Sequence, residues 1–294
     1  MTINHYCYLR PEILSLLASD DIFTQAEQQP TRYSYAEAIL ELGERNPKIV
    51  VLDADVSKSI KTNEFAEKFP ERSFNFGIAE QNMMAAAAGM ATTGLIPYAT
   101  TYAVFASMRA LDMVRNSIHY PKLNVKIAAS HGGITPGPDG VTHQGQEDLS
   151  IIRAIANSTI IAPADPATTK LAVWAAAEYE GPVVIRLPFV ADLYPTLYSN
   201  ELDYVIGKSL TLRNGNDAAI LATGALVNDA LDASEALEQN GIHARVLDIH
   251  TIKPLDKELL IAEASKTGCV ITAEENVLRG GFGSAVLELF SDEG

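Results

Sequence analysis

The segment from Ala129 to Asp148, which reads ASHGGITPGPDGVTHQGQED, has the highest density of chemically capable residues in the sequence. His131 and His143 lie in it among five glycines, at positions 132, 133, 137, 140 and 145. Glycine allows a backbone to approach a ligand closely, and an imidazole can exchange hydrogen bonds with a substrate hydroxyl or carbonyl. Two histidines that only bond loop carbonyls are the structural alternative. Because no Cys or third His lies nearby at ligand spacing, a zinc site is disfavoured.

Glu80 is a second candidate, in the segment NFGIAEQN at the start of a predicted helix over residues 78–90. At helical spacing its side chain shares a face with Met83, Met84 and Ala87. A carboxylate on an apolar face must be paired, protonated or catalytic. The alternative is an ordinary first-turn glutamate that faces the helix dipole.

Tyr102 and Phe105 are three positions apart, so that their rings can flank one flat group. Two core aromatics are the alternative. The sequence has no G-x-x-x-x-G-K-[ST], G-x-G-x-x-G or G-x-S-x-G motif. A nucleotide-dependent kinase or dehydrogenase and an α/β-hydrolase are therefore disfavoured.

The elements that must position these residues alternate between strand and helix. Strands are predicted over 48–52, 124–129, 158–162 and 182–187, and helices over 34–45, 78–90, 105–118 and 166–178, the first with a capping box of Ser34 and Glu37. This alternation predicts a parallel sheet with helices on both faces, in which ligands bind beyond the carboxyl ends of the strands. The polar segments 53–59, 130–146 and 163–165 all follow strands, so we expect them at one end of the sheet.

The whole chain is predicted to form two parallel-sheet α/β domains. We expect an N-terminal extension over residues 1–30, a first domain over 31–192, a linker over 193–205 and a smaller second domain over 206–294. Predicted elements of the second domain are strands over 218–221, 244–247 and 269–272 and helices over 227–239, 256–267 and 283–290. The sequence stops soon after the last helix, which indicates a truncated domain or a face covered by a partner.

Composition narrows the functional classes. The 294 residues are 47% apolar and 20% charged, as in a globular protein, and 22 basic against 37 acidic residues give a net charge of −15. This charge disfavours binding to nucleic acid or anionic lipid but allows a local basic pocket for a phosphorylated metabolite. Two cysteines, Cys7 and Cys269, fit a reducing cytoplasm. Neither a signal peptide nor an apolar run of about 20 residues is seen.

Several motifs, taken in order, resemble the C-terminal half of a transketolase. They are Asp53-Ala54-Asp55, Gly77-Ile78-Ala79-Glu80-Gln81-Asn82, Ile96-Pro97-Tyr98, Ser130-His131, Asp139-Gly140-Val141-Thr142-His143-Gln144 and Ile252-Lys253-Pro254-Leu255-Asp256. The resemblance implies a thiamine-diphosphate enzyme of pentose phosphate metabolism that transfers a two-carbon ketol unit from a ketose phosphate to an aldose. The first domain would then be the pyrimidine-binding domain and the second the transketolase C-terminal-like domain.

The resemblance also implies roles for the candidate residues. Glu80 would hydrogen-bond N1′ of the cofactor's aminopyrimidine and promote proton loss from the thiazolium. Residues implied around the cofactor are Asp55, Tyr102, Phe105 and Met108, the last in place of a third aromatic side chain. His131 and His143 would contact substrate hydroxyls and the reacting carbon. Implied contacts to the substrate also include Asp139 at a hydroxyl and Arg32 and Ser59 at the terminal phosphate.

Two departures from the family pattern are informative. Ala162 stands where single-chain transketolases usually have an arginine that grips phosphate, so Arg186 or Arg109 is predicted to replace it. The sequence has no Gly-Asp-Gly, the segment that holds the diphosphate and a divalent metal in thiamine enzymes. The resemblance therefore implies that Mg²⁺ and the diphosphate are held by a partner, an N-terminal-half transketolase subunit, in an α2β2 heterotetramer, and that this chain has no metal ligand.

Alternatives stay open at this point. The β subunit of a 2-oxoacid dehydrogenase shares both domains, although the two-histidine loop favours a polyhydroxylated sugar as substrate. A 1-deoxyxylulose-phosphate synthase fragment is a further alternative. A non-catalytic subunit that keeps the fold is disfavoured, because a scaffold needs neither Glu80 nor the ring-bearing residues named above.

Overall fold

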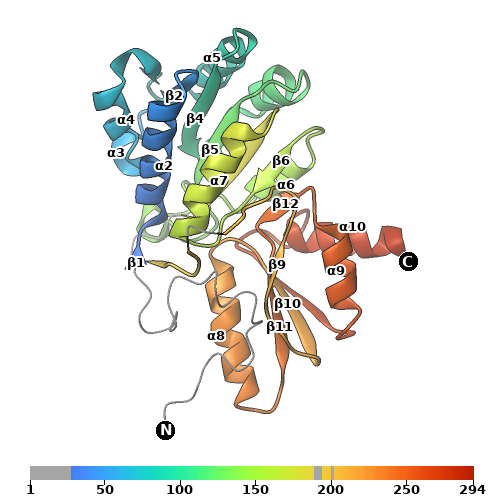
Figure 1. Ribbon diagram of the computed structural model, residues 1–294. Helices are drawn as coiled ribbons and strands as arrows, with labels where there is room; N and C mark the ends of the chain where they lie inside the picture. Colours follow the sequence, from blue (N-terminus) through green and yellow to red (C-terminus); the bar gives the residue numbers. More distant parts are fainter. Residues whose placement is uncertain (1–27, 189–193, 200–201) are drawn as a thin grey trace.

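The structure is a computed structural model that describes residues 28–188, 194–199 and 202–294 (Figure 1). Most of the predicted N-terminal extension, residues 1–27 with Cys7, lies outside the described residues, as do 193 and 200–201 of the predicted linker. The described part of the chain folds into two α/β domains, one above the other in Figure 1.

The first domain is built on a sheet of seven strands in the order β12-β6-β7-β5-β4-β2-β3. Their bounds are β2 Ile49–Asp53, β3 Ser73–Asn75, β4 Ile96–Tyr102, β5 Lys126–Gly132, β6 Thr159–Ile161, β7 Val183–Pro188 and β12 Thr251–Lys253. Neighbouring strands are parallel except at the edge, where β12 pairs antiparallel with β6. Strand β12 comes from the second half of the chain and crosses the domain boundary predicted from the sequence.

Helices cover both faces of this sheet, as the alternation predicts. Alternate residues of β2 enter two separate apolar clusters, Val51 in one and Val50 and Leu52 in the other. The first cluster contains residues of α2 Thr31–Arg45 and α7 Pro166–Glu178. The second contains residues of α5 Glu80–Thr92, η2 Phe105–Arg109, η3 Met113–His119 and α6 Asp148–Arg153. Short turns of helix fill the connections: α3 Ser57–Ile60, α4 Asn63–Lys68, η1 Pro70–Arg72 and η4 Gly137–Asp139.

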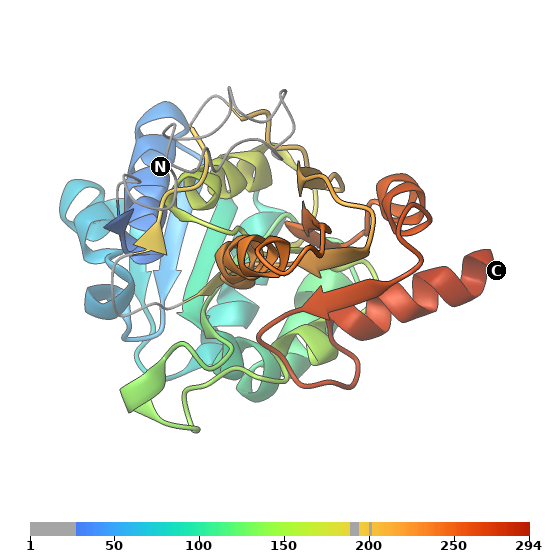
Figure 2. The same cartoon turned by 90° about the horizontal axis from the view of Figure 1, so that it is seen from below.

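The second domain has a four-stranded sheet in the order β13-β10-β11-β9. The strands are β9 Leu210–Arg213, β10 Ala218–Ala222, β11 Ala244–Asp248 and β13 Val270–Ala273, and the helices are α8 Leu226–Glu238, α9 Lys257–Ala264 and α10 Phe282–Glu293. Strand β9 is antiparallel and the other pairs are parallel. Helix α10 lies on the side of the molecule away from α2–α4 in both ribbon views (Figures 1 and 2).

The two domains share a buried polar junction. Asp165 caps α7 through the Thr168 amide and also accepts hydrogen bonds from the amides of Leu197 and Tyr198. The Tyr198 hydroxyl donates to Asp248 at 2.8 Å, and burial raises the pKa of the Asp248 carboxyl to about 7. A further short antiparallel pair joins β1 Gln28–Gln29 to β8 Tyr194–Pro195. Both apolar clusters continue into the second domain, so the domains form one packed body.

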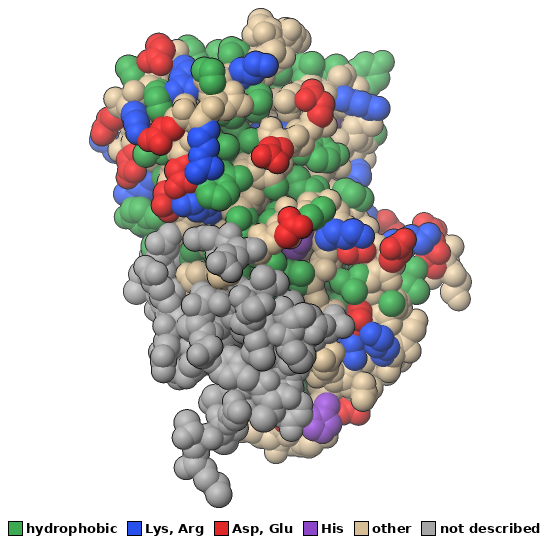
Figure 3. Space-filling model, viewed as in Figure 1, with side chains coloured by type: hydrophobic (Ala, Val, Ile, Leu, Met, Phe, Trp, Pro, Cys, Tyr) green, Lys and Arg blue, Asp and Glu red, His purple; other side chains and the backbone are tan. Residues whose placement is uncertain are grey.

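The outer surface of the first domain carries both signs of charge. Figure 3 shows basic and acidic side chains interspersed over this face. The ion pairs of Lys170 with Glu37 and Glu41 join α7 to α2, and Lys68 pairs with Glu44. Opposite charges are thus paired locally, and this face offers no continuous basic patch.

Two local predictions were wrong. Helix α2 begins at Thr31 after Pro30, and Ser34 is buried inside it, so the predicted capping box does not form. The helix predicted over 105–118 is two π-helical segments, in which the Ala110 amide bonds to the Phe105 carbonyl and the Tyr120 amide to the Arg115 carbonyl. Such i→i+5 segments occur often at functional sites.

Candidate active site

The candidate active site lies at the carboxyl ends of β2, β4 and β5. The register pairs Asp53 with Thr100 and Tyr102 with Ser130, so the residues that follow these strands share one edge of the sheet. This confirms the prediction that the polar segments after β2 and β5 lie at the same end. Strand β4, which the sequence analysis missed, carries Tyr102 at its last position.

Four rings form a compact cluster at this edge. The Tyr102 ring stacks on His131 with centroids 3.7 Å apart and lies 5.8 Å from the Phe105 ring. His143 meets both aromatic rings edge-on, at 5.7 Å from Tyr102 and 5.6 Å from Phe105. Tyr102 and Phe105 are only partly buried. The glycine-rich loop thus brings both predicted histidines to the predicted aromatic pair.

His131 is held in an unusual backbone conformation. Its φ is 62°, in the left-handed region where a residue other than glycine is strained. The Nδ1 atom bonds the Ser130 hydroxyl at 2.9 Å, and Nε2 lies 3.6 Å from the Asp139 carboxylate. Burial lowers the pKa of His131 to about 3, with smaller contributions from His143 and Arg32. The imidazole is therefore neutral near pH 7 and can donate or accept a hydrogen bond.

The remaining predicted substrate residues surround this cluster. Ser59 in α3 accepts a hydrogen bond of 3.1 Å from the Tyr102 hydroxyl. Arg32 lies in the first turn of α2, and its charge is near enough to lower the His131 pKa. Asp139 is exposed, next to His131. Asp55 is also exposed and, like His131, has a φ of 62°.

Glu80 is buried as the first residue of α5. It is 1% exposed, and Met83, Met84 and Ala87 on the same helix face are 0% exposed, so the predicted apolar face is confirmed. Both carboxylate oxygens accept hydrogen bonds from Arg109, at 3.0 and 2.9 Å. The guanidinium carbon lies 4.4 Å from the Phe105 ring centroid, which connects Glu80 to the ring cluster.

The residues present fit a flat, nitrogen-containing ring. Glu80 supplies a buried carboxylate that accepts hydrogen bonds, and Tyr102 and Phe105 supply apolar faces beside it. Met108 is exposed at 42%, on the turn next to Arg109. Within the described ranges no group of three or more His, Cys, Asp or Glu side chains is arranged to hold a metal ion.

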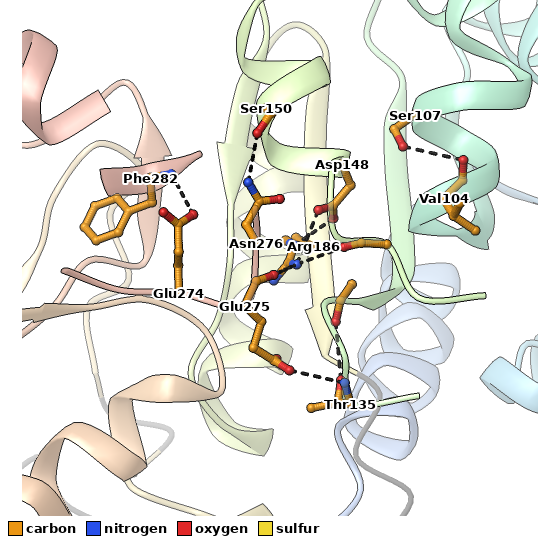
Figure 4. A network of polar contacts seen from close by, with 12 residues as sticks. Val104, Ser107, Thr135, Asp148, Ser150, Arg186, Glu274, Glu275, Asn276 and Phe282 are labelled. Carbon is orange, nitrogen blue, oxygen red and sulfur yellow. Dashed lines mark hydrogen bonds and ion pairs between the residues drawn. The ribbon is translucent and has the colours of Figure 1, made fainter. Parts of the chain in front are cut away.

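The placement of Arg186 argues against a contact to phosphate. Its side chain is 5% exposed and donates to Asp148 at 2.7 Å and to the Glu275 carbonyl at 2.6 Å (Figure 4). Burial and these partners leave the guanidinium no access to a substrate. Ala162 is itself buried, with its amide bonded to the His250 carbonyl. Of the two predicted replacements, only Arg109 reaches the site, and there it pairs with Glu80.

The sequence analysis missed the contribution of the second domain. Glu275 follows β13 and accepts hydrogen bonds from the amides of Ile134 and Thr135, in the loop that carries His143. A signal was available, because the polar run Glu274-Glu275-Asn276 follows a predicted strand, as the site segments of the first domain do.

Comparison with known proteins identifies the family to which this architecture belongs. The two domains and the ring-and-carboxylate site define a protein of the class that joins a pyrimidine-binding domain to a transketolase C-terminal domain. The family model "Transketolase, pyrimidine binding domain" matches residues 27–189, and "Transketolase, C-terminal domain" matches residues 207–294. The chain belongs to the transketolase family and corresponds to the C-terminal section of a split transketolase. Membership implies thiamine diphosphate as the cofactor.

Individual relatives agree with this assignment. The chain is 47% identical over 265 residues to a putative transketolase C-terminal section of Methanocaldococcus jannaschii, which covers 90% of this chain and 82% of that protein. A solved split gene transketolase, described as an inactive beta4 tetramer, is 51% identical with a TM-score of 0.83, over 90% of this chain and 86% of that one. A 1-deoxy-D-xylulose-5-phosphate synthase of Geobacter sulfurreducens is 40% identical over 88% of this chain but only 40% of its own length. Such synthases are thus related family members.

No helix in the part of the chain that the structure describes is long and apolar enough to cross a membrane.

Proposed function

We propose that this chain is the catalytic C-terminal subunit of a transketolase that moves a two-carbon ketol unit from a ketose phosphate to an aldose. The observation that carries the proposal is that Arg109 links a buried Glu80 carboxylate to a cluster of two aromatic rings and two imidazoles. A role in pentose phosphate metabolism in the cytoplasm follows from this activity and from the two cysteines of the sequence.

The chain's own residues prepare the cofactor ring. When bound, thiamine diphosphate supplies the nucleophile and the electron sink for the transfer. Glu80 holds a proton at a ring nitrogen, and burial strengthens this hydrogen bond because water does not compete for the carboxylate. Tyr102, Phe105, Met108 and Asp55 are the residues that would surround the ring, and the two aromatic side chains would supply apolar contacts to it. Arg109 donates to both Glu80 oxygens, so a ring nitrogen would compete with it for the carboxylate.

Polar groups around the ring cluster then hold the sugar. His131 is neutral, so that it can hydrogen-bond a hydroxyl without adding charge, and His143 lies beside it against the same aromatic rings. Asp139 reads a further hydroxyl from the loop. Arg32 and Ser59 enter from α2 and α3 and are the residues we propose for the terminal phosphate.

A second polypeptide completes the site. We infer an N-terminal-half transketolase subunit with a Gly-Asp-Gly segment that holds Mg²⁺ and the diphosphate, because the 294 residues contain no such segment. The assembly we propose is α2β2. The similar solved structure is described as an inactive beta4 tetramer, which supports the proposal that this chain is inactive alone.

Reconstitution tests this function. The purified chain is mixed with an N-terminal-half subunit, thiamine diphosphate and Mg²⁺, and ketol transfer from a ketose phosphate to an aldose is compared with pyruvate decarboxylation. We expect ketol transfer from the mixture and none from either subunit alone. Pyruvate decarboxylation alone would favour the dehydrogenase or synthase alternatives, and cofactor binding without turnover would favour a non-catalytic subunit.

A further inference from the structure

We propose that Glu275, in the second domain, is a positioning residue for the substrate loop of the first domain, defined here as residues 133–145. The inference deepens the proposed function, on which its kinetic test rests, because this loop carries Asp139 and His143. Figure 4 shows Glu275 on the strand-end segment of the second domain, with its carboxylate directed at Thr135.

The first argument is a direct contact. One oxygen of the Glu275 carboxylate, Oε1, accepts hydrogen bonds from two consecutive loop amides, those of Ile134 at 3.3 Å and Thr135 at 3.2 Å. A carboxylate that accepts from backbone amides is a charge-assisted contact, about twice as strong as a neutral one. Ile134 is 60% exposed and Val141 76% exposed, so apolar burial contributes little to holding these parts of the loop.

The second argument is the close approach that glycine permits. A Cβ atom built on Gly133 would lie 2.5 Å from the Glu275 Cβ, and Gly133 has a φ of +82°. At the preceding position, a Cβ on Gly132 would lie 2.7 Å from Nε of Arg186. Any other residue would push the loop away from both side chains. Gly133 is therefore explained by the contact with the second domain, and Gly132 by the approach to Arg186 of β7.

The third argument is that Arg186 joins the backbone of Glu275 to the base of the substrate loop. Arg186 donates to the Glu275 carbonyl at 2.6 Å and to the Gly145 carbonyl at 3.3 Å, while Asp148 fixes its guanidinium. The amide of Gly133 bonds the Gly145 carbonyl at 2.7 Å, which closes the loop on itself. The backbone of Glu275 is thus fixed by Arg186, and its carboxylate sets the position of the loop.

The chain contains a matched control. Glu274, the adjacent residue, also accepts two backbone amide hydrogen bonds, from Phe282 at 2.6 Å and Gly283 at 2.8 Å. These amides begin α10 within the second domain. Glu274→Ala therefore removes equivalent contacts at a place that does not touch the substrate loop.

Hydrogen exchange of the full isolated chain tests the contact without any need for activity. We expect Glu275→Ala to speed exchange of the Ile134 and Thr135 amides by at least about tenfold, a free-energy change of about 1.4 kcal/mol. Glu275→Gln keeps an oxygen acceptor and should stay closer to the parent protein, and Glu274→Ala should leave both amides unchanged. If Glu275→Ala does not fold, Gly133→Ala replaces it in the exchange experiment, because this substitution displaces the loop while keeping the Glu275 side chain. Unchanged protection in Glu275→Ala, or equal loss in Glu274→Ala, overturns the proposal.

Kinetics of the assembled enzyme supply the second readout. Glu275→Ala should raise KM for the ketose phosphate by about tenfold or more and change kcat less, with rescue by Glu275→Gln, because the loop binds sugar hydroxyls. A fall in kcat with an unchanged KM overturns the positioning role. If the parent assembly shows no ketol transfer at all, the proposed function fails while the exchange result still decides the contact.

Discussion

Two arginine–carboxylate pairs in the first domain have the same chemistry and opposite surroundings. The Glu80–Arg109 pair joins a buried carboxylate to an arginine side chain that is 44% exposed. In the Asp148–Arg186 pair both side chains are 5% exposed. The first pair is open to solvent on one side and the second is sealed.

The difference shows which pair can be exchanged for a ligand. Solvent stabilises the Arg109 guanidinium when it leaves Glu80, so opening this pair leaves one buried charge, the Glu80 carboxylate, for a ligand to compensate. Arg186 is buried and donates to the Asp148 carboxylate and to the carbonyls of Glu275 and Gly145. Breaking a sealed pair leaves a buried charge uncompensated. We therefore read the open pair as functional and the sealed pair as structural.

The largest effect expected is on catalysis at the open pair. Glu80→Gln keeps the size of the side chain but removes its charge and basicity, so ketol transfer by the reconstituted enzyme should fall by at least about a hundredfold. Turnover is measured with saturating cofactor. Urea denaturation should show a stability within about 1 kcal/mol of the parent chain. Turnover within tenfold of the parent assembly would remove Glu80 from the mechanism and break the comparison.

The sealed pair should instead control stability. Asp148→Asn removes the charge that compensates Arg186, and we expect a loss of about 3–5 kcal/mol in the free energy of unfolding. Urea denaturation of the isolated chain measures it. The double variant Asp148→Asn with Arg186→Met should recover part of the loss, because no buried charge remains. A single-variant loss below about 1 kcal/mol would show that solvent reaches the pair.

Burial of His131 in the ring cluster predicts a pH effect on stability. The His131 pKa is about 3 in the folded chain against a usual value near 6.5, so between these values the unfolded chain binds more protons. Stability must then fall as the pH falls. Lowering the pH from 7 to 5 should reduce the contribution of His131 to the free energy of unfolding by about 2 kcal/mol. His131→Gln should remove this part of the slope in denaturation experiments at the two pH values, and an unchanged slope would show that the folded imidazole titrates normally.

A smaller loss than that of Asp148→Asn is expected at the exposed partner of the open pair. Arg109→Met leaves the buried Glu80 carboxylate without its arginine, so the free energy of unfolding of the isolated chain should fall by about 1–3 kcal/mol. Thermal or urea unfolding measures the change. A loss as large as that of Asp148→Asn would show that the two pairs are energetically alike and would remove the distinction drawn between them.

The sequence was sufficient where the signal is local. The apolar face that buries Glu80 is a helical repeat within one segment, and the spacing of Tyr102 and Phe105 lies within one turn. Strand β4 was missed because Pro97 in IPYATTY argues against a central strand, although isoleucine, tyrosine and threonine favour one. Thr100 and Thr101 are 0% exposed between the neighbouring strands.

Long-range pairing could not be predicted from one sequence. Arg186 meets Asp148 from 38 positions away and the Glu275 carbonyl from 89 positions away. No local pattern marks such partners, and a lone arginine after a strand fits a ligand contact equally well. The family resemblance supplied the site residues but had no information on this contact between domains.

Strand β12 has a consequence for cutting or recombining the chain. It completes the edge of the first sheet from a position beyond the first strands of the second domain. A fragment that stops in the linker would leave the outer edge of β6 without its hydrogen-bonding neighbour, and unpaired edges promote aggregation. The two domains are therefore not interchangeable modules, and a chimera between relatives must inherit residues 251–253 together with the β6 edge that they cover.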